Sequence, residues 1–178
     1  TAAKTYNNLT VNKSGGTLTA GGSTTSITLN GAMTLTGGTF AAGTATTINV
    51  AGDWTNNGAT FTPGAGTVVF NGVGAQNING TTAAKTFNNL TVNKSGGTLT
   101  AGGSTTSITL NGTMTLTAGT FAAGTATTIN VAGDWTNNGA TFTPGAGTVV
   151  FNGAGAQNIN VKTPPKTFNN VTCNKTGG

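Results

Sequence analysis

Residues 27–47 read ITLNGAMTLTGGTFAAGTATT, and residues 48–68 read INVAGDWTNNGATFTPGAGTV. The two stretches align without a gap, so that Ile27 falls on Ile48. Each begins with apolar side chains at alternate positions, which is the pattern of a strand with one buried face. Each strand is followed by a glycine, a residue typical of tight turns. Short strands that return in register every 21 residues predict coils stacked in a parallel β-solenoid.

The whole chain repeats with a period of 81 residues. When residues 1–81 are laid over residues 82–162, only six positions differ. The differing pairs are Tyr6/Phe87, Ala32/Thr113, Gly37/Ala118, Val73/Ala154, Gly80/Val161 and Thr81/Lys162. We therefore expect one continuous solenoid made of repeat 1 (residues 1–81), repeat 2 (residues 82–162) and the start of a third repeat (residues 163–178).

Four apolar pairs in each repeat predict four coils of about 20–21 residues. In repeat 1 these pairs are Leu9/Val11, Ile27/Leu29, Ile48/Val50 and Val68/Phe70. At a spacing of about 4.8 Å, nearly nine coils would form a rod about 40 Å long. The fold class is therefore expected to be all-β. A β-sandwich or barrel is the alternative, but neither requires like residues in register every 21 positions.

Stacked coils predict columns of equivalent side chains. The inward column would contain Val11, Leu29, Val50, Phe70, Val92, Leu110, Val131, Phe151 and Cys173. A ladder of corner amides, hydrogen-bonded along the stack as in cross-β structures, would contain Asn12, Asn30, Asn71, Asn93, Asn111, Asn152 and Asn174. In this scheme Cys173 is a small core residue rather than a reactive thiol. Thr10 and Thr28 would begin an outward row of hydroxyl groups.

The composition argues against catalysis. The 178 residues include 42 Thr, 30 Gly and 23 Asn, but only nine charged residues and no His, Arg or Glu. With one Asp in each repeat, neither a pair of catalytic carboxylates nor a Ser–His–Asp group can be assembled. We therefore expect a protein that is not an enzyme and has no metal site and no cofactor.

The charge pattern also bears on possible partners. Seven scattered lysines face only Asp53 and Asp134, and they form no cluster of the kind that binds phosphate groups, so we expect no nucleic-acid partner. No apolar run reaches the length of a membrane span. Trp54 and Trp135 could stack on a sugar ring. Because each shares a column with a methionine, a place in the core is favoured instead.

Two phrases carry a family resemblance. AGDWTNNGATFTPGAGTVVFNG (residues 51–72) and TFNNLTVNKSGGTLT (residues 86–100) resemble the repeats of large bacterial secreted β-strand-repeat surface proteins, which are akin to adhesins and autotransporter passenger domains. The resemblance extends over essentially the whole chain. It implies a non-enzymatic scaffold located outside the cell or on the cell surface.

Three functional hypotheses remain open. The leading one is a structural segment of an extracellular fibre, stalk or sheath. In it, residues 1–16 of one chain would stack on or beside residues 163–178 of the next, or the chain would continue into further repeats. The second is an adhesin whose Thr/Asn faces bind a polysaccharide or another surface. The third is ice binding, although Asn49 and Val69 interrupt the outward threonine row.

Overall fold

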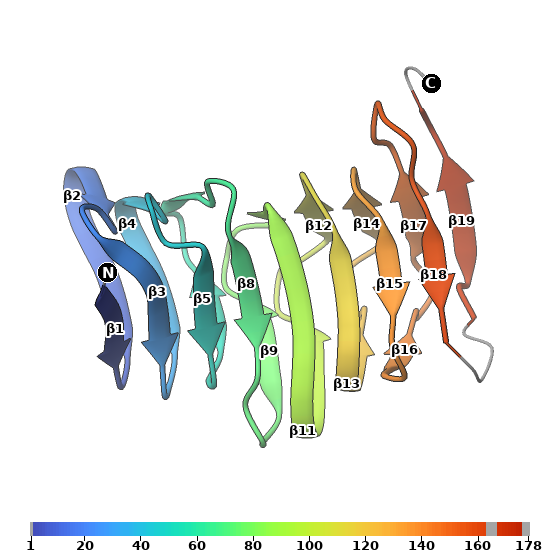
Figure 1. Ribbon diagram of the computed structural model, residues 1–178, viewed down its shortest axis with the longest axis horizontal. Helices are drawn as coiled ribbons and strands as arrows, with labels where there is room; N and C mark the ends of the chain where they lie inside the picture. The colour runs from blue at the N-terminus through green and yellow to red at the C-terminus, as the bar shows by residue number, and fades with distance from the viewer. Residues whose placement is uncertain (1, 163–166, 176–178) are drawn as a thin grey trace.

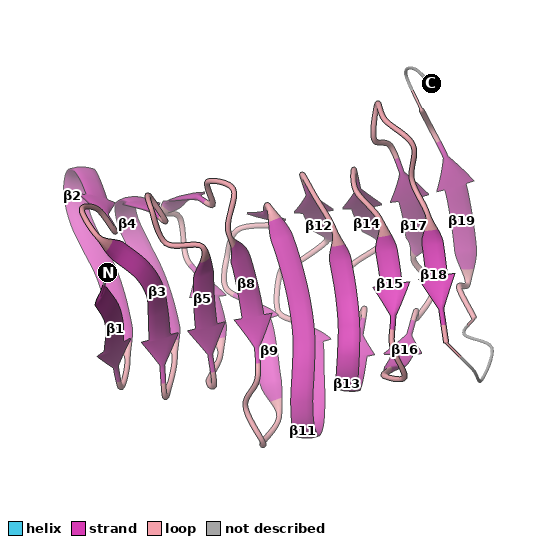
Figure 2. Ribbon diagram, in the orientation of Figure 1, coloured by secondary structure: helices cyan, strands magenta, loops and turns pink. Residues whose placement is uncertain are grey.

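The computed structural model describes residues 2–162 and 167–175, and the protein is an all-β, parallel β-solenoid of about eight turns (Figure 1). No helix occurs in these residues (Figure 2). The strands are β1 (Ala2–Tyr6), β2 (Leu9–Thr19), β3 (Thr24–Leu29), β4 (Met33–Ala41), β5 (Thr47–Val50), β6 (Trp54–Asn56), β7 (Thr60–Thr62), β8 (Thr67–Phe70), β9 (Gln76–Asn79), β10 (Ala84–Phe87), β11 (Asn89–Ala101), β12 (Ser107–Leu110), β13 (Met114–Ala122), β14 (Thr128–Val131), β15 (Trp135–Asn137), β16 (Thr141–Thr143), β17 (Thr148–Phe151), β18 (Ile159–Val161) and β19 (Asn170–Cys173).

Each turn has three strand-bearing sides. Side 1 is the front row of Figure 1 and contains β1, β3, β5, β8, the first half of β11, the first half of β13, β15 and β18. Side 2 contains the first halves of β2 and β4, then β6, β9, the second halves of β11 and β13, and β16. Side 3 contains the second halves of β2 and β4, then β7, β10, β12, β14, β17 and β19. Strands on either side of the repeat boundary pair directly, so repeats 1 and 2 form one continuous stack.

The pairing register gives three and two-thirds turns per repeat, where the sequence pattern predicts four. Lys4–Tyr6 lies on side 1 and pairs with Ile27–Leu29. Its equivalent in repeat 2, Lys85–Phe87, lies on side 3 and pairs with the next strand of that side. Eleven sides, at three to a turn, separate the two segments, so a turn has about 22 residues. Repeat 2 is therefore rotated by one side of the solenoid relative to repeat 1.

The predicted number of turns differs from the observed number because the sequence pattern misses one strand of each repeat. That strand has a lysine at an inward position. Lys85 is only 2% exposed, and it precedes the buried Phe87 by two positions. This strand therefore lacks the apolar alternation by which the others are recognised. The sequence reading assigned the first coil to the segment around Val11 instead, whereas Val11 pairs with Leu35 on side 2 and not with Leu29.

The predicted inward column is confirmed from Leu29 to Val92 and from Leu110 to Cys173, and it breaks between Val11 and Leu29 and again between Val92 and Leu110. It forms two stacks, Leu29, Val50, Phe70 and Val92 on side 1, and Leu110, Val131, Phe151 and Cys173 on side 3. Val92 continues to Leu116 rather than to Leu110. Every predicted member except Cys173 is buried, and Cys173 is exposed. Burial of these columns supplies the apolar core, since nonpolar area removed from water is the main favourable term in folding.

The predicted amide ladder is absent from the described residues. All seven of its asparagines are exposed, and no hydrogen bond joins two of their side chains. Other side chains connect the turns, each accepting a hydrogen bond from a backbone N–H group 24 residues further along the chain. These bonds run from Ala32 to Asn8, Asn77 to Asp53, Thr81 to Asn57, Thr113 to Asn89 and Asn158 to Asp134.

Asn89→Ala should therefore destabilise the fold more than Asn30→Ala. The Asn89 Oδ1 atom accepts from the Thr113 N–H at 2.8 Å, and its loss leaves a partly buried donor without this partner. We expect a cost of about 1 kcal/mol in the free energy of unfolding for Asn89→Ala and less than about 0.5 kcal/mol for the exposed Asn30→Ala. Urea denaturation of the two variants measures this difference. Equal losses would contradict the assignment.

Candidate repeat-junction site

A buried lysine binds repeat 2 to repeat 1. Lys94, on β11 of repeat 2, is 1% exposed, and its Nζ atom reaches into the loop between β8 and β9 of repeat 1. It donates hydrogen bonds to the backbone oxygens of Gly72 at 2.6 Å and Gly74 at 2.9 Å. It also donates to the Gln76 Oε1 atom at 2.6 Å. Three oxygens thus surround one ammonium group; we call this arrangement the lysine cage.

Gln76 holds the loop in the shape that accepts the lysine. Its Nε2 atom donates to the Val50 oxygen at 2.9 Å and the Gly52 oxygen at 2.5 Å, while its Oε1 atom accepts from the Gly72 N–H at 2.9 Å. Gly72 must be glycine, because a Cβ atom there would lie 2.0 Å from the backbone oxygen of Ala51. The cage is therefore built from loop residues of repeat 1, and repeat 2 supplies the lysine.

The same cage recurs at the end of repeat 2. Lys175 donates to the backbone oxygens of Gly153 and Gly155 and to the Gln157 Oε1 atom. Lys13 is the corresponding lysine of repeat 1. It is exposed, and within the described part of the chain its Nζ atom makes no hydrogen bond. Over the described residues, two such cages are therefore filled, and the corresponding lysine of repeat 1 lies outside a cage.

An aromatic cluster forms the apolar half of the junction. Phe87 of repeat 2 is fully buried against three rings of repeat 1. The ring centroids lie 5.2 Å from Trp54, 6.2 Å from Phe61 and 6.5 Å from Phe70, in edge-to-face geometry. Such pairs stabilise beyond the effect of area burial alone. Phe168 repeats the arrangement against repeat 2, with its centroid 5.2 Å from that of Trp135.

Lys85 lies where the strand ladder of side 3 is interrupted. No ladder joins β7 to β10, although both strands are fully described. A cavity of about 200 Å³ lies between them, lined by residues that include Trp54, Phe61 and Lys85. The Lys85 Nζ atom donates to both the backbone oxygen and the hydroxyl of Thr82. Burial lowers the pKa of Lys85 and of Lys94, because desolvation disfavours the charged form.

Both tryptophans lie in the core, which is the position that their shared columns with methionine predict. Trp54 pairs with Met33, and Trp135 pairs with Met114. The exposed fractions of Trp54 and Trp135 are 1% and 0%, so neither indole face can stack on a sugar ring in this conformation.

The site residues that sequence reasoning missed are Gln76 and Lys94. In the sequence, Lys94 is only one of seven scattered lysines. A signal was nevertheless present, because the pairs Gln76/Lys94 and Gln157/Lys175 have the same spacing. Glycines at alternate positions before each glutamine mark a loop that can present several backbone oxygens to one cation.

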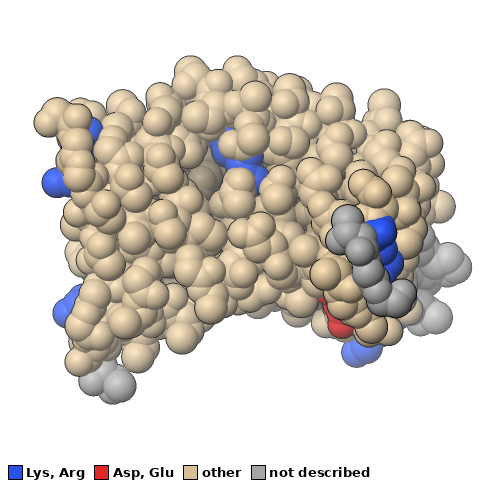
Figure 3. Space-filling view, turned by 90° about the horizontal axis from the view of Figure 1, so that it is seen from above, with Lys and Arg blue, Asp and Glu red and all other residues tan. Residues whose placement is uncertain are grey.

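The outer surface carries little charge. In the view of Figure 3 the lysines are scattered, and one blue group lies in a hollow near the middle of the face. Over residues 2–162 and 167–175, no three His, Cys, Asp or Glu side chains gather as a metal site would require. In the same residues no helix has the length and apolar character needed to cross a membrane.

Comparisons of the chain with protein-family models, with curated proteins and with solved structures find no match. The fold and the junction therefore define the class of protein to which the chain is assigned. It is a repeat-built β-solenoid in which each repeat boundary carries a lysine cage and an aromatic cluster.

Proposed function

We propose that this protein is a structural, non-catalytic β-solenoid segment of an extracellular fibre, stalk or sheath, and that its segments join end to end. The location follows the resemblance to bacterial secreted β-strand-repeat surface proteins. The role follows the architecture, because a stack of near-identical turns makes a rod whose length is set by the number of repeats.

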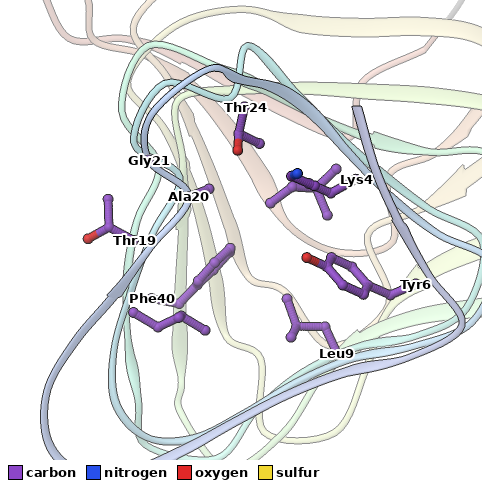
Figure 4. A pocket seen from close by; sticks show the side chains of 10 residues that line it. Lys4, Tyr6, Leu9, Thr19, Ala20, Gly21, Thr24 and Phe40 are labelled. Carbon is purple, nitrogen blue, oxygen red and sulfur yellow. The ribbon is translucent and has the colours of Figure 1, made fainter. Parts of the chain in front are cut away.

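The observation that carries this proposal is the position of the exposed apolar side chains. Among the described residues, six large apolar side chains are exposed. They are Tyr6, Leu18, Val73, Ile159, Val161 and Val171. All except Val73 lie in the first or the last turn. Figure 4 shows the N-terminal end, where Tyr6, Leu9 and Phe40 point into an open cavity of about 250 Å³.

Solenoid ends of this kind favour association. An end turn exposes unpaired backbone N–H and C=O groups as well as core side chains, and natural solenoids usually cover their ends with polar caps. Here the two ends differ from each other, so a contact between them is heterologous. Because a heterologous contact need not close into a ring, it propagates as a filament.

The adhesin and ice-binding alternatives receive less support from the surface. Outward threonines stack in short runs, such as Thr10, Thr34 and Thr55, and the next partner in that run is Asn79. In addition, the rotation of repeat 2 moves each run to another side of the rod. No side therefore carries one uninterrupted threonine row from repeat 1 into repeat 2 of the described chain.

Electron microscopy and light scattering of the purified chain test the proposal. We expect filaments one solenoid wide whose mean length rises with protein concentration, because a head-to-tail contact obeys mass action. Separate rods of constant length at all concentrations would contradict end-to-end joining. Specific binding of a polysaccharide by such separate rods would favour the adhesin alternative.

A further inference from the structure

We propose that copies of this solenoid segment join by strand exchange, in which residues 1–16 of a second copy displace residues 167–175 of the first and place Lys13 in the cage of Gly153, Gly155 and Gln157. This proposal rests on the proposed function, because it names the partner and the contact for end-to-end joining. It replaces the expectation that the two segments stack on or beside each other.

The junction between repeats 1 and 2 is the template for this contact. Residues 82–97 pack on the last turn of repeat 1, and we call the last turn of a repeat its acceptor. Residues 1–16 differ from residues 82–97 only by Tyr6 in place of Phe87. In the acceptor, the loop of residues 152–157 differs from the loop of residues 71–76 only by Ala154 in place of Val73. A second copy therefore offers the acceptor of repeat 2 nearly the same partner that repeat 1 already binds.

Equivalent side chains are buried at the junction between repeats 1 and 2 and exposed in the first and last turns. Tyr6 is 44% exposed and Leu18 is 41% exposed, whereas Leu99, the equivalent of Leu18, is fully buried by repeat 1. At the acceptor, Ile159 is 49% exposed. Its equivalent Ile78 is fully buried and pairs with Ala101. Joining two copies in the template geometry would bury both sets of side chains together.

The segment now in the acceptor fills it incompletely. Phe168 and Lys175 make the aromatic and cage contacts, and β19 pairs with β17. However, Val171 is 49% exposed, whereas its equivalent Leu90 is fully buried under the next turn. A second copy continues from residues 1–16 into the rest of its solenoid, so it would cover Ile159 and the incoming strand together. The additional burial of apolar side chains favours exchange over the form in which residues 167–175 stay in the acceptor of their own chain.

The lysine cage sets the register of the exchanged strand. An ammonium group among three oxygens gains charge-assisted hydrogen bonds that are stronger than neutral ones. A slip of one residue would remove Lys13 from these oxygens and turn the apolar side chains of the strand outward. The cage therefore selects one alignment between copies, which is the alignment found between repeats 1 and 2.

Paired cysteines test the exchange directly. Val150 and Thr172 are register partners on β17 and β19. In the template, Val69 and Thr91 are the corresponding partners, so exchange would bring Thr10 of a second copy beside Val150. Neighbouring strands place partner Cα atoms about 4.8 Å apart, which is within the range of a disulfide.

Two variants, each also carrying Cys173→Val, separate the alternatives. Thr10→Cys with Val150→Cys should form a disulfide-linked ladder of dimers, trimers and longer chains under oxidation, and the ladder should disappear on reduction. Thr172→Cys with Val150→Cys should form an intrachain disulfide that reduces filament mass at least tenfold, with recovery on reduction. The matched control is Cys173→Val alone, which should assemble without covalent links.

The possible results distinguish the two proposals. If the Thr172/Val150 disulfide forms and filaments persist, the strand exchange is wrong and joining occurs by simple stacking. If the control assembles and the Thr10/Val150 variant yields no covalent oligomers, the exchange is also wrong. If no chain assembles at any concentration, the proposed end-to-end function itself fails.

Lys13→Met gives a further check, because it should raise the concentration needed for assembly about tenfold while the melting temperature of the monomer stays unchanged.

Discussion

Lys94→Met should lower the stability of the protein by about 2–4 kcal/mol, because removal of the ammonium group leaves the buried oxygens of the cage without their donor. Methionine keeps the length and much of the packing of the lysine stem, so the loss reports on the hydrogen bonds. The affected oxygens belong to Gly72, Gly74 and Gln76. Urea denaturation followed by circular dichroism measures the change.

Lys13→Met is the matched control. Lys13 stands in the same phrase as Lys94, but it is exposed in the first turn. The same substitution should therefore change the free energy of unfolding by no more than about 0.5 kcal/mol. If both variants lose equal stability, the contribution comes from the lysine stem or from the strand itself, and the cage has no special role.

The burial of the two lysines also predicts a pH dependence. The pKa of Lys94 and of Lys85 is lower in the folded protein than in the unfolded chain. Between the lowered pKa and the ordinary value near 10.5, the unfolded chain binds more protons, so the stability should rise with pH. In Lys94→Met the rise should be smaller. A fall in stability over this range in the parent chain would contradict the assignment.

Val50→Asp should cost about 4 kcal/mol or more, which is enough to unfold the turns around it. Val50 is completely buried between Leu29 and Phe70, and an aspartate there would place an unpaired charge in the apolar interior. Asn49→Asp is the control, since Asn49 is the preceding residue on the same strand and points outward. Its cost should stay below about 1 kcal/mol. A Val50→Asp chain that melts like its parent would contradict the inward register.

The sequence predicted those parts of the fold that depend on apolar alternation and repetition. The strands that contain Ile27, Ile48 and Val68 all return in register, and the parallel solenoid is confirmed. The rotation between repeats was missed because it depends on Lys85, whose side chain lies inward although its type suggests the surface.

The junction was less predictable for a physical reason. The cage consists mainly of backbone oxygens, and a sequence pattern shows side-chain types rather than the direction of carbonyl groups. The predicted asparagine ladder was wrong because exposed amides at a turn can bind water at no cost. The asparagines that do connect the turns, such as Asn8 and Asn89, each accept a hydrogen bond from a backbone N–H group 24 residues further along the chain.

The axial rise per chain in the filaments tests the central proposal most directly. If strand exchange joins the copies, each chain advances the filament by two repeats, which is seven and one-third turns or about 35 Å at a spacing of about 4.8 Å per turn. Successive chains should also differ by one side of the solenoid in rotation, as two repeat-boundary steps require. Electron cryomicroscopy of the assembled chain gives both values. A rise of about 35 Å, with strand ladders that cross the junction on two sides as they do between repeats 1 and 2, is the predicted result. Separate rods or contacts between like ends would contradict it.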